Sequence, residues 1–472
     1  MSKERRTISA SSLPARLKQH AVDRPEAIAY RLHSSGTLTY RQLADQVDAF
    51  ANWLSDRVPR GATIILSCPS DLKYPVAFLG LLAAGCSVFP ILLDASDMEL
   101  SRAATESGAV GIVGDHRAES HGTSSMGFLT IFEFAESGCP TMRLSLRADP
   151  WPPSSAGKSF GDLLLQSSGT TGLPKIVRRS GASLDAVAQA TAEAIGFTVA
   201  DRVLMTVPLT HSYGLEHGLL APIWAGSSIH LCPGLDLQIL LPELANGITI
   251  FPGVPSTFEM LANLPGEAAP MPRLRSAYSA GAPLPRSVFD RFLARYGVRI
   301  TQLYGATEVG SVTFNPPSEP FDPASVGRAM RGVSIRILDV NDCACDIAKS
   351  SGATVILRYS EGSGCDRTSD GSLGVSQNDE SPANEEGQIA ISAPSMFSDY
   401  LNAESNLIDG HFPTGDLGHF DASGRLFVTG RLKLLIDVGG LKVNPLEVEA
   451  VLQQHPGVAA CAVIHISGYR LC

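Results

Sequence analysis

The chain has 472 residues, of which 44% are hydrophobic, so it is long enough for two or more folded units with large cores. Its formal net charge of −10 argues against nucleic acid as the main partner, because binding a polyanion requires an excess of basic side chains. The nine cysteines are scattered and form no CxxC pair, which favours reduced thiols in the cytoplasm over a disulfide framework or a zinc site.

The segment Tyr74–Leu93 carries no charged residue and is long enough to cross a bilayer. Proline and glycine residues interrupt it at several points. We therefore expect a short buried helix that ends near Ala84, followed by a buried strand at Cys86–Phe89. No membrane span is expected.

Helical and strand patterns alternate along most of the chain. Thr39 and Gln42 have the spacing of a capping box, and the apolar residues that follow, up to Leu54, lie on one helical face. Ser287–Tyr296 predicts another helix, which ends at Gly297. Short apolar runs predict buried strands at Leu163–Leu165, Val203–Val207, Ile229–Cys232, Ile248–Phe251 and Val298–Leu303. This alternation predicts an α/β fold with internal sheets flanked by helices.

Two segments differ in composition from the rest of the chain. Residues 140–161 are rich in Pro, Ser and Gly and indicate a possible junction between subdomains. Residues 341–386 are rich in Ser, Gly, Asp and Asn, with one brief apolar run at Thr354–Leu357. This composition is typical of a surface insertion that is partly disordered.

The sharpest local signal is Ser167–Lys175, which reads Ser-Ser-Gly-Thr-Thr-Gly-Leu-Pro-Lys. Small residues let backbone N–H groups approach phosphate oxygens, hydroxyls add donors, and Lys175 adds a positive charge. The spacing from Gly169 to Lys175 differs from that of a Walker A loop, and Ile176–Val177 predicts a strand rather than a helix. An unrelated P-loop nucleotidase is therefore not favoured. For this segment alone, an ordinary Gly/Thr turn remains the alternative.

Ser167–Lys175 resembles the phosphate loop of the AMP-binding superfamily. That superfamily includes acyl- and aryl-CoA ligases, peptide-synthetase adenylation domains and beetle luciferases. Further segments resemble the family's motifs in the family's order, and the resemblance covers roughly Leu38 to Ile464. They are a gate segment (Val207–Gly214), an adenine turn (Tyr278–Pro283), a nucleotide segment (Leu303–Glu308), a ribose segment (Phe412–Gly418) and a hinge (Gly430–Lys433).

The resemblance implies that these segments bind ATP. The phosphate loop would contribute Ser167, Ser168, Gly169, Thr170, Thr171, Gly172 and Lys175. Other nucleotide contacts would come from Gly281, Ala282, Pro283, Tyr304, Gly305, Ala306, Thr307, Asp416 and Arg431. The residue chemistry suits these roles. Tyr304 offers an aromatic face for adenine, Asp416 can accept both ribose hydroxyls, and Arg431 can donate to the ribose or to phosphate.

Three residues are the implied catalytic groups. Lys175 would neutralise charge on the leaving pyrophosphate, and Thr307 can donate a hydrogen bond to a phosphate. Glu308 is a hard oxygen ligand that suits Mg²⁺, which bridges ATP phosphates. Taken singly, each residue has a structural alternative, such as a solvated glutamate. The order of the segments favours the functional interpretation.

The resemblance implies a reaction in two steps. A carboxylic acid is activated as an acyl-AMP, and a thiol of coenzyme A, or of a phosphopantetheine arm on an acyl carrier protein, then takes the acyl group. His211 and Tyr213 would border the acyl pocket, and Lys433 would be the hinge of a mobile C-terminal domain. An amino-acid substrate would need a buried aspartate near the gate, where Glu216 is the acidic residue and has no evident pocket context. A carboxylic acid without an α-amino group is therefore favoured. Fatty, short-chain and aryl acids all remain open, with fatty or aryl acids preferred, and we assign no role to His217.

The expected domains are a large N-terminal domain at residues 1–430 and a hinge with a shortened α+β C-terminal domain at residues 431–472. Within the latter, Asn444–Gln454 predicts a capped helix and Val458–Ile466 a strand. The family's C-terminal domain carries a lysine that contacts the carboxylate and the α-phosphate, but no lysine follows Lys442 here. The second hypothesis is therefore a catalytically impaired nucleotide-binding protein of the same fold.

Overall fold

The computed structural model describes residues 12–33, 36–114, 128–135, 141–147, 161–167, 174–339, 386–432, 436–438, 441–443, 445–452, 455, 458 and 461–463. Its contacts divide the chain into two compact units. The first unit comprises Met1–Ser334 and Ser392–Leu407, and the second comprises Ile335–Ile391 and Ile408–Cys472. The domain boundary expected at residue 430 stays a prediction.

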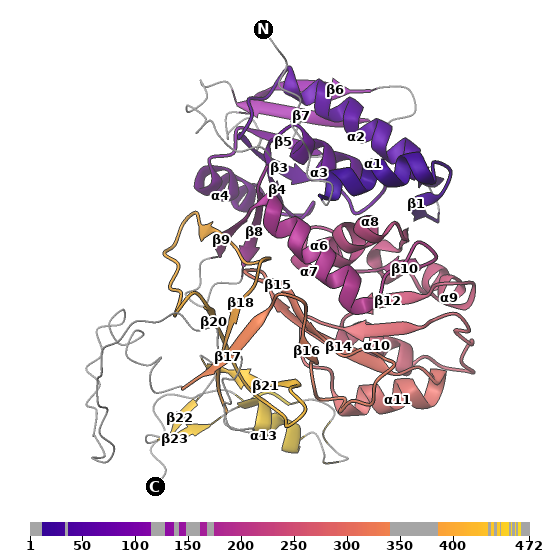
Figure 1. The fold of residues 1–472 in the computed structure, drawn as a ribbon, viewed down its shortest axis with the longest axis vertical. Helices are drawn as coiled ribbons and strands as arrows, with labels where there is room; N and C mark the ends of the chain where they lie inside the picture. The colour runs from indigo at the N-terminus through magenta and orange to yellow at the C-terminus, as the bar shows by residue number, and fades with distance from the viewer. Residues whose placement is uncertain are drawn as a thin grey trace, which may run out of the picture. The chain divides into compact units, whose positions relative to one another are not determined.

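The first unit contains two large sheets (Figure 1). Among the described residues one sheet has eight strands, mostly parallel at its centre. Their order is β19 (Asp399–Tyr400), β9 (Lys175–Arg179), β8 (Leu163–Ser167), β4 (Ser87–Pro90), β3 (Thr63–Ser67), β5 (Gly111–Gly114), β7 (Met142–Arg147) and β6 (Phe128–Phe134). The chain enters this sheet early and returns to it at β19, so residues from distant parts of the sequence share one sheet.

The other sheet of the first unit has nine strands within the described ranges, and its five central strands are parallel. Their order is β16 (Arg328–Ala329), β15 (Gly310–Phe314), β14 (Ile300–Ala306), β13 (Ser276–Ser279), β12 (Ile250–Gly253), β10 (Arg202–Met205), β11 (Ser228–Leu231), β1 (Ile28–Leu32) and β2 (Gly36–Thr39). Parallel neighbours place their carboxyl ends at one edge of the sheet, which is where ligands bind in open α/β folds.

Helices cover both faces of both sheets (Figure 1). They are α1 (Leu13–Asp23), α2 (Tyr40–Ser55), α3 (Lys73–Ala83), α4 (Asp97–Ser107), α6 (Gly181–Ile195), α7 (Ser212–Leu215), the π-helix η1 (Glu216–Leu220), α8 (Ala221–Ala225), the 3₁₀ turn η2 (Pro233–Leu235), α9 (Leu237–Ala245), α10 (Pro255–Ala262) and α11 (Arg286–Tyr296).

Alternating side chains of each strand pack into different helical layers. Ile64 of β3 joins a core with α2, α3, α6 and α8, whereas its neighbour Ile65 packs with α4. Val203 of β10 joins the first of these cores, whereas Leu204 packs with α9, α10 and α11. The side-chain period of two therefore builds an α/β/α/β/α stack, in which one shared core binds the two sheets together.

The second unit is small. Its four-stranded sheet has the order β17 (Ser334–Leu338), β18 (Gly387–Ser392), β20 (Phe412–Phe420) and β21 (Leu426–Arg431). Its other described elements are the hairpin of β22 (Ile436–Val438) and β23 (Leu441–Val443), and helix α13 (Pro445–Leu452). Most of the expected insertion at 341–386 lies outside the described residues.

Most of the expected elements are confirmed, with shifts of a few residues at their ends. In the capping box, Gln42 N donates to Thr39 Oγ1 at 3.2 Å, and Thr39 N donates to Gln42 Oε1 at 2.9 Å. The uncharged segment after residue 73 folds as α3 and β4, and no described helix has the length and apolarity to cross a membrane. Among the described cysteines, Cys68, Cys86, Cys232 and Cys461 form no disulfide.

The possible junction at residues 140–161 stays a prediction, although part of it is an ordered strand, and one expected strand differs from the structure. Met142–Arg147, inside the expected junction 140–161, forms β7, which pairs with β5 and β6 in the sheet that also contains β8. The strand expected at Val458–Ile466 is wrong for its described residues, which lie in no strand. There Val463 N donates a hydrogen bond to the Glu449 side chain of α13 at 2.7 Å. This backbone N–H is therefore bonded to a helix side chain and not to a neighbouring strand.

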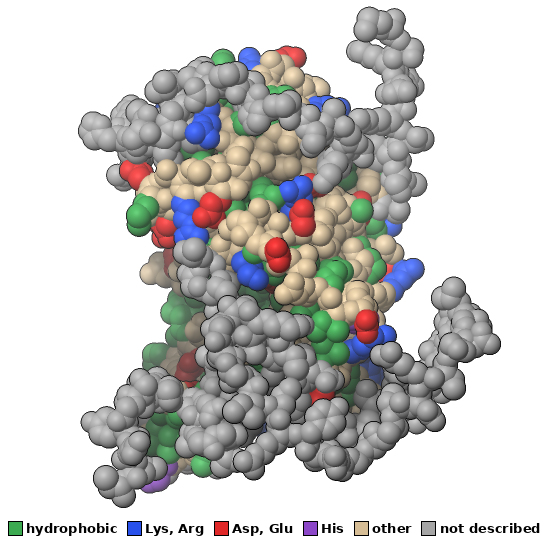
Figure 2. All heavy atoms as spheres, turned by 90° about the vertical axis from the view of Figure 1, so that its left-hand side faces the viewer, with side chains coloured by type: hydrophobic (Ala, Val, Ile, Leu, Met, Phe, Trp, Pro, Cys, Tyr) green, Lys and Arg blue, Asp and Glu red, His purple; other side chains and the backbone are tan. Residues whose placement is uncertain are grey.

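Acidic and basic side chains alternate over the face drawn in Figure 2. Among the coloured, described residues in that view, neither sign forms a broad patch. Exposed ion pairs such as Lys18–Asp48 and Arg331–Glu193 mix the two signs at close range.

Candidate active site

The phosphate-loop segment joins two antiparallel strands. Ser167, buried at the end of β8, and Lys175, at the start of β9, are register partners across the β8–β9 pair. Ser168, Gly169, Thr170, Thr171 and Gly172 lie outside the described residues. Ile176 and Val177 continue as strand, as expected. A strand therefore follows this loop, whereas a helix follows a Walker A loop.

Thr307 and Glu308 lie in a tight turn between β14 and β15. Ala306 and Gly310 pair at the base of this hairpin, so the turn projects Glu308 from the end of the sheet. The Glu308 side chain is 9% exposed, and Thr307 is half-buried. A carboxylate that is nearly buried requires partners, because an isolated charge is costly away from water.

Tyr400 contacts both of the expected catalytic charges. Its hydroxyl donates to Glu308 Oε1 at 3.0 Å, and Lys175 Nζ lies 4.6 Å from the centroid of its ring. Burial and the neighbouring Glu308 carboxylate raise the pKa of Tyr400, so the hydroxyl stays protonated and acts as a donor. Sequence reasoning missed Tyr400, since no local motif marks it. Strand β19, which pairs with β9, places it there.

The segment around Tyr400 also forms hydrogen bonds to the Glu308 turn and to the start of β9. Phe397 N donates to the Glu308 carbonyl at 2.7 Å, and Ser395 Oγ donates to the Val309 carbonyl at 2.6 Å. Asn402 accepts from Ile176 N at 2.8 Å. One segment thus fixes the Glu308 turn and the start of β9 in the same part of the first unit.

The adenine turn follows β13, directly beside β14. Gly281 has φ +86°, a conformation that favours glycine, and Gly281, Ala282 and Pro283 are exposed. On β14, Tyr304 is half-buried and Gly305 is exposed, and Ala306 follows them. Because β13 and β14 are parallel neighbours, these two segments meet at one sheet edge. Their residues are available to a ligand there.

The gate segment is the link from β10 to α7. His211 is exposed, and partial desolvation of its ring lowers its pKa. The Tyr213 hydroxyl donates to the Gly253 carbonyl at 3.1 Å, which ties the gate to the carboxyl end of β12. The role of these two residues at an acyl pocket stays a prediction.

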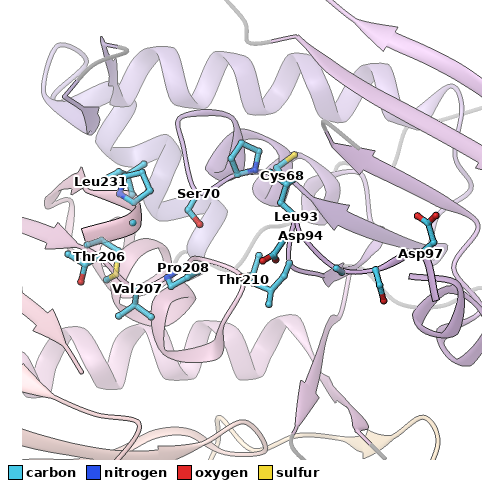
Figure 3. A pocket seen from close by; sticks show the side chains of 17 residues that line it. Cys68, Ser70, Leu93, Asp94, Asp97, Thr206, Val207, Pro208, Thr210 and Leu231 are labelled. Carbon is cyan, nitrogen blue, oxygen red and sulfur yellow. The ribbon is translucent and has the colours of Figure 1, made fainter. Parts of the chain in front are cut away.

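A pocket of about 850 Å³ lies beside the gate segment (Figure 3). Its walls follow the carboxyl ends of β3, β4, β10 and β11, so both sheets contribute to it. Leu209 N donates to Ser70 Oγ at 3.0 Å, which links the two walls. The Thr206 and Thr210 hydroxyls are buried and lack a hydrogen-bond partner among the described residues. The lining of the pocket is mainly apolar, with Asp94 and Asp97 as its charged residues.

A buried ion pair lies behind the gate. Arg179 Nη1 and Glu216 Oε1 are 2.6 Å apart, and the side chains are 0% and 2% exposed. Burial alone would raise the pKa of Glu216, but the Arg179 charge and hydrogen bonds, including those from Ser311, hold it below its ordinary value. Sequence reasoning found no context for Glu216. Its partner stands 37 positions away on β9, beyond the reach of local patterns.

His217, to which the sequence assigned no role, continues this cluster. Ser311 Oγ donates to Glu216 Oε2 at 2.7 Å, so its lone pairs are left to accept from His217 Nε2 at 3.0 Å. His217 Nδ1 then accepts from the Tyr278 hydroxyl at 2.8 Å. Burial lowers the pKa of His217 to about 4, which keeps the ring neutral, so that one ring nitrogen donates and the other accepts. The result is a chain of hydrogen bonds with one direction, ending on the Glu216 charge.

His217 should make the protein sensitive to acid. Its pKa is about 4 when folded and 6.5 when unfolded, so the unfolded chain takes up the proton first. The contribution of the neutral His217 ring to the free energy of unfolding is fully present above about pH 6.5. It is lost as the pH falls towards 4, by up to about 3 kcal/mol. Urea unfolding from pH 7.5 to 4.5 should show a shallower decline for His217→Gln than for the parent. The exposed control His33→Gln should follow the parent. Equal slopes for parent and His217→Gln would contradict the assignment.

The second unit contains the expected ribose residues. Asp416 of β20 and Arg431 of β21 are cross-strand partners, and Arg431 Nε donates to Asp416 Oδ1 at 2.7 Å. The Asp416 side chain is 8% exposed and that of Arg431 is 58% exposed. The pair thus holds a carboxylate in a fixed orientation. Lys433 lies outside the described residues.

Comparisons with known proteins identify the family of the chain. The family model described as AMP-binding enzyme matches residues 17–354. Malonate–CoA ligase of Arabidopsis thaliana is 28% identical over 339 residues, which cover 66% of this chain and 49% of that protein. Sulfoacetate–CoA ligase of Cupriavidus necator is 30% identical over 325 residues, covering 68% and 56%.

A solved structure shows the same fold. ATP-bound MatB from Rhodopseudomonas palustris superposes with a TM-score of 0.75 at 23% identity, and the match covers 96% of this chain and 85% of that one. The chain spans about half the length of the curated relatives it matches. Since the family model covers more than half of the sequence, the chain belongs to the AMP-binding enzyme family.

Proposed function

We propose that this chain uses ATP to activate a carboxylic acid as an acyl-adenylate and then transfers the acyl group to a thiol. The observation that carries the proposal is the convergence of Lys175 and Glu308 on Tyr400. A cation and a hard carboxylate held by one side chain suit the phosphates of ATP and their counter-ion. Membership of the AMP-binding family and the CoA-ligase names of the relatives support the same reaction.

The proposed chemistry has two displacements. A carboxylate oxygen of the acid attacks the α-phosphorus of ATP, the bond to the bridging oxygen breaks, and pyrophosphate leaves. A thiol sulfur then attacks the acyl carbon, its proton passes to solvent, and AMP leaves. Lys175 and the backbone amides of the phosphate loop would offset charge on the leaving pyrophosphate, and Thr307 would donate to a phosphate oxygen.

Glu308 fits the role of a Mg²⁺ ligand. Its carboxylate is a nearly buried hard oxygen donor, oriented through Oε1 by Tyr400. Within the described ranges, no cluster of three or more His, Cys, Asp or Glu side chains could hold a metal by itself. The cation would therefore be shared between Glu308 and the nucleotide, where it would offset phosphate charge.

The remaining nucleotide contacts would come from the candidate adenine and ribose residues. Gly281–Pro283 and Tyr304 would contact adenine, and Asp416 would accept the ribose hydroxyls. Arg431, already bonded to Asp416, would orient that carboxylate and donate to the ribose or a phosphate. Lys433 would act as the hinge between the two steps.

For the acid, we propose a fatty or aryl acid without a second anionic group. The relatives' names specify malonate and sulfoacetate, and each of these acids carries a second anion. Here the guanidinium of Arg179, which contacts the π-helix η1 behind the gate segment, is already neutralised by Glu216. The pocket of Figure 3 is lined mainly by apolar and hydroxyl groups, with Asp94 and Asp97 as its charged residues. This lining disfavours an additional anion.

For the acceptor, the CoA-ligase names of the relatives favour coenzyme A over the phosphopantetheine arm of a carrier protein. Both offer the same thiol, so the chemistry is unchanged. The location of the reaction in the cytoplasm stays a prediction.

The test is acid-dependent exchange of labelled pyrophosphate into ATP, screened over fatty, aryl, malonic and sulfoacetic acids. We expect exchange with at least one fatty or aryl acid, and a thioester product when coenzyme A is added. Exchange with malonate or sulfoacetate alone would overturn the acid class. AMP binding without exchange for any acid would instead indicate the impaired nucleotide-binding protein.

Tyr400→Phe should reduce acyl-AMP formation by about tenfold or more, because a hydrogen bond to a charged group contributes about 1.5–3 kcal/mol. The variant keeps the ring beside Lys175 but removes the donor to Glu308. Tyr296→Phe is the matched control, since it removes a hydroxyl that donates to the Leu261 carbonyl between α10 and α11. Equal exchange rates for Tyr400→Phe and the parent would show that this hydroxyl does not orient Glu308.

A further inference from the structure

The buried cluster around Glu216 joins the elements that carry the candidate nucleotide site. Arg179 lies on β9, which begins at Lys175, and Glu216 and His217 lie on the π-helix after the gate. Tyr278 lies on β13, three residues before Gly281. Ser311 lies on β15, three residues after Glu308. The cluster therefore connects four elements of the first unit, each of which carries or adjoins a different candidate segment.

The contacts leave little freedom between these elements. The Glu216 carboxylate accepts from Arg179 Nη1, from Ser311 N at 2.9 Å and from Ser311 Oγ. His217 bridges Ser311 and Tyr278 through its two ring nitrogens. The Glu216 carboxylate fixes the donor and acceptor roles along this series of hydrogen bonds. A shift of any of these elements would therefore break a buried hydrogen bond that water cannot replace.

The backbone is adapted to this cluster at Gly310. The residue has φ +74°, and a Cβ added there would lie 2.8 Å from Glu216 Oε1 and 2.9 Å from Arg179 Nη2. Only glycine allows the carboxylate and the guanidinium to pass this close to the base of the Glu308 turn. The ion pair thus lies directly against the hairpin that presents Glu308.

Stability alone gives a poor account of the pair. A buried ion pair is commonly no more stabilising than well-packed apolar residues of similar size, because the desolvation of both charges offsets their attraction. Arg179 Nε and Nη2 also lack hydrogen-bond partners among the described residues, which adds to that cost. In some proteins a buried polar or ionic group instead fixes one arrangement of the elements around it.

We propose that Arg179 and Glu216, acting through Ser311, His217 and Tyr278, are positioning residues that hold the phosphate-loop strand, the π-helix after the gate, the adenine turn and the Glu308 hairpin in one arrangement. The inference rests on the proposed function, because it concerns the same nucleotide site. None of the five side chains needs to touch a substrate for this role.

The test uses a double variant, since a single substitution would leave an uncompensated buried charge. Arg179→Met/Glu216→Gln removes both charges and keeps an amide oxygen that can accept from Ser311 N. We expect it to fold, with an AMP Kd and an ATP KM above those of the parent. The kcat of pyrophosphate exchange should fall by roughly 10–100-fold, the size of effect expected when reacting groups lose their alignment.

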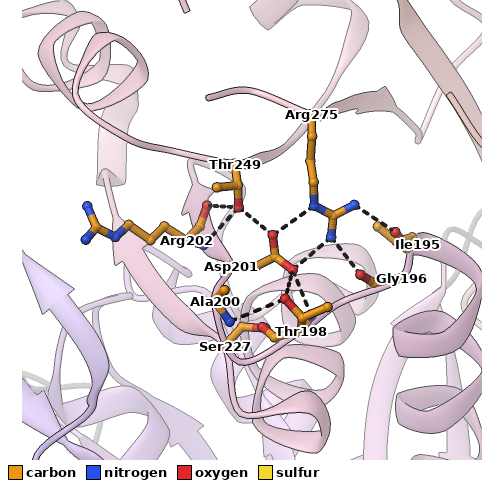
Figure 4. Close-up of polar contacts among 9 residues, drawn as sticks. All are labelled: Ile195, Gly196, Thr198, Ala200, Asp201, Arg202, Ser227, Thr249 and Arg275. Atoms are coloured by element: carbon orange, nitrogen blue, oxygen red, sulfur yellow. Dashed lines mark hydrogen bonds and ion pairs between the residues drawn. The ribbon is translucent and has the colours of Figure 1, made fainter. Parts of the chain in front are cut away.

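The chain offers a matched control in the pair Asp201–Arg275 (Figure 4). Asp201 accepts from Arg275 at 2.8 and 2.9 Å and from Thr249 and Thr198, at the amino ends of β10, β12 and β13. It therefore occupies the same sheet but the edge opposite to the candidate site. Asp201→Asn/Arg275→Met should lower the melting temperature at most modestly and leave AMP binding and kcat as in the parent.

The outcomes separate this inference from the proposed function. If the parent binds AMP and the Arg179/Glu216 double variant has the same AMP Kd, ATP KM and kcat, the inference is overturned and the function stands. If the double variant melts far below the Asp201/Arg275 control, the pair is a stability element and the inference is again overturned. If the parent binds no AMP, both fail. Arg179→Lys, which keeps the charge pair, should retain most of the AMP affinity.

Discussion

Glu308→Gln should reduce Mg²⁺-dependent acyl-AMP formation by roughly 10²–10³-fold, the loss typical of one preorganised electrostatic contact in a reaction centre. The amide keeps the shape of the side chain and an oxygen that accepts from the Tyr400 hydroxyl, so the hairpin turn should stay in place. What disappears is the negative charge that a hard cation requires. The effect should therefore be specific to steps that need Mg²⁺.

Three measurements together test this prediction. Pyrophosphate exchange should collapse, AMP binding without metal should survive, and a higher Mg²⁺ concentration should restore part of the exchange. Glu193→Gln is the control, because Glu193 is an exposed carboxylate paired with Arg331 on the surface. If Glu308→Gln lost AMP binding and exchange to the same extent, Glu308 would be needed for folding and not for the metal.

Asp416→Ala should weaken AMP binding by about 100-fold or more, because two hydrogen bonds from ribose hydroxyls to a charged group contribute about 1.5–3 kcal/mol each. The cost to folding should be small. The partner Arg431 is 58% exposed, so water can hydrate its guanidinium once the carboxylate is removed. The substitution should thus lower the affinity for AMP strongly while changing the free energy of unfolding only slightly.

Calorimetric titration of AMP and of 2′,3′-dideoxy-AMP provides the sharpest comparison. The parent should prefer AMP, whereas Asp416→Ala should bind the two ligands nearly alike, because the hydroxyls have lost their acceptor. A variant that binds AMP as tightly as the parent does would show that Asp416 is not the ribose ligand. Urea unfolding of both proteins checks that the second unit remains folded.

The local elements could be predicted from the sequence because their causes are local. Thr39 and Gln42 cap the same helix end and lie three residues apart, so their spacing alone identifies the start of α2. Ile176 and Val177 follow a glycine-rich segment as β-branched residues, and they form strand β9. In contrast, the strand expected at Val458–Ile466 is absent at its described positions. There the backbone N–H of Val463 donates to the side chain of Glu449 on helix α13.

The amino-acid sequence by itself determined the α/β class and most of the elements, because caps, periodicity and glycine-rich turns act over a few residues. The order of the candidate nucleotide-binding segments came from their resemblance to the family's motifs. Only the tertiary structure decided which side chains meet. Tyr400 and Glu308 stand 92 positions apart, and His217 and Ser311 stand 94 apart. Such contacts depend on strand order: β19 returns to β9, and parallel β13 and β14 bring their carboxyl ends together. No local pattern encodes that order, since it results from burying both sheets around one shared core.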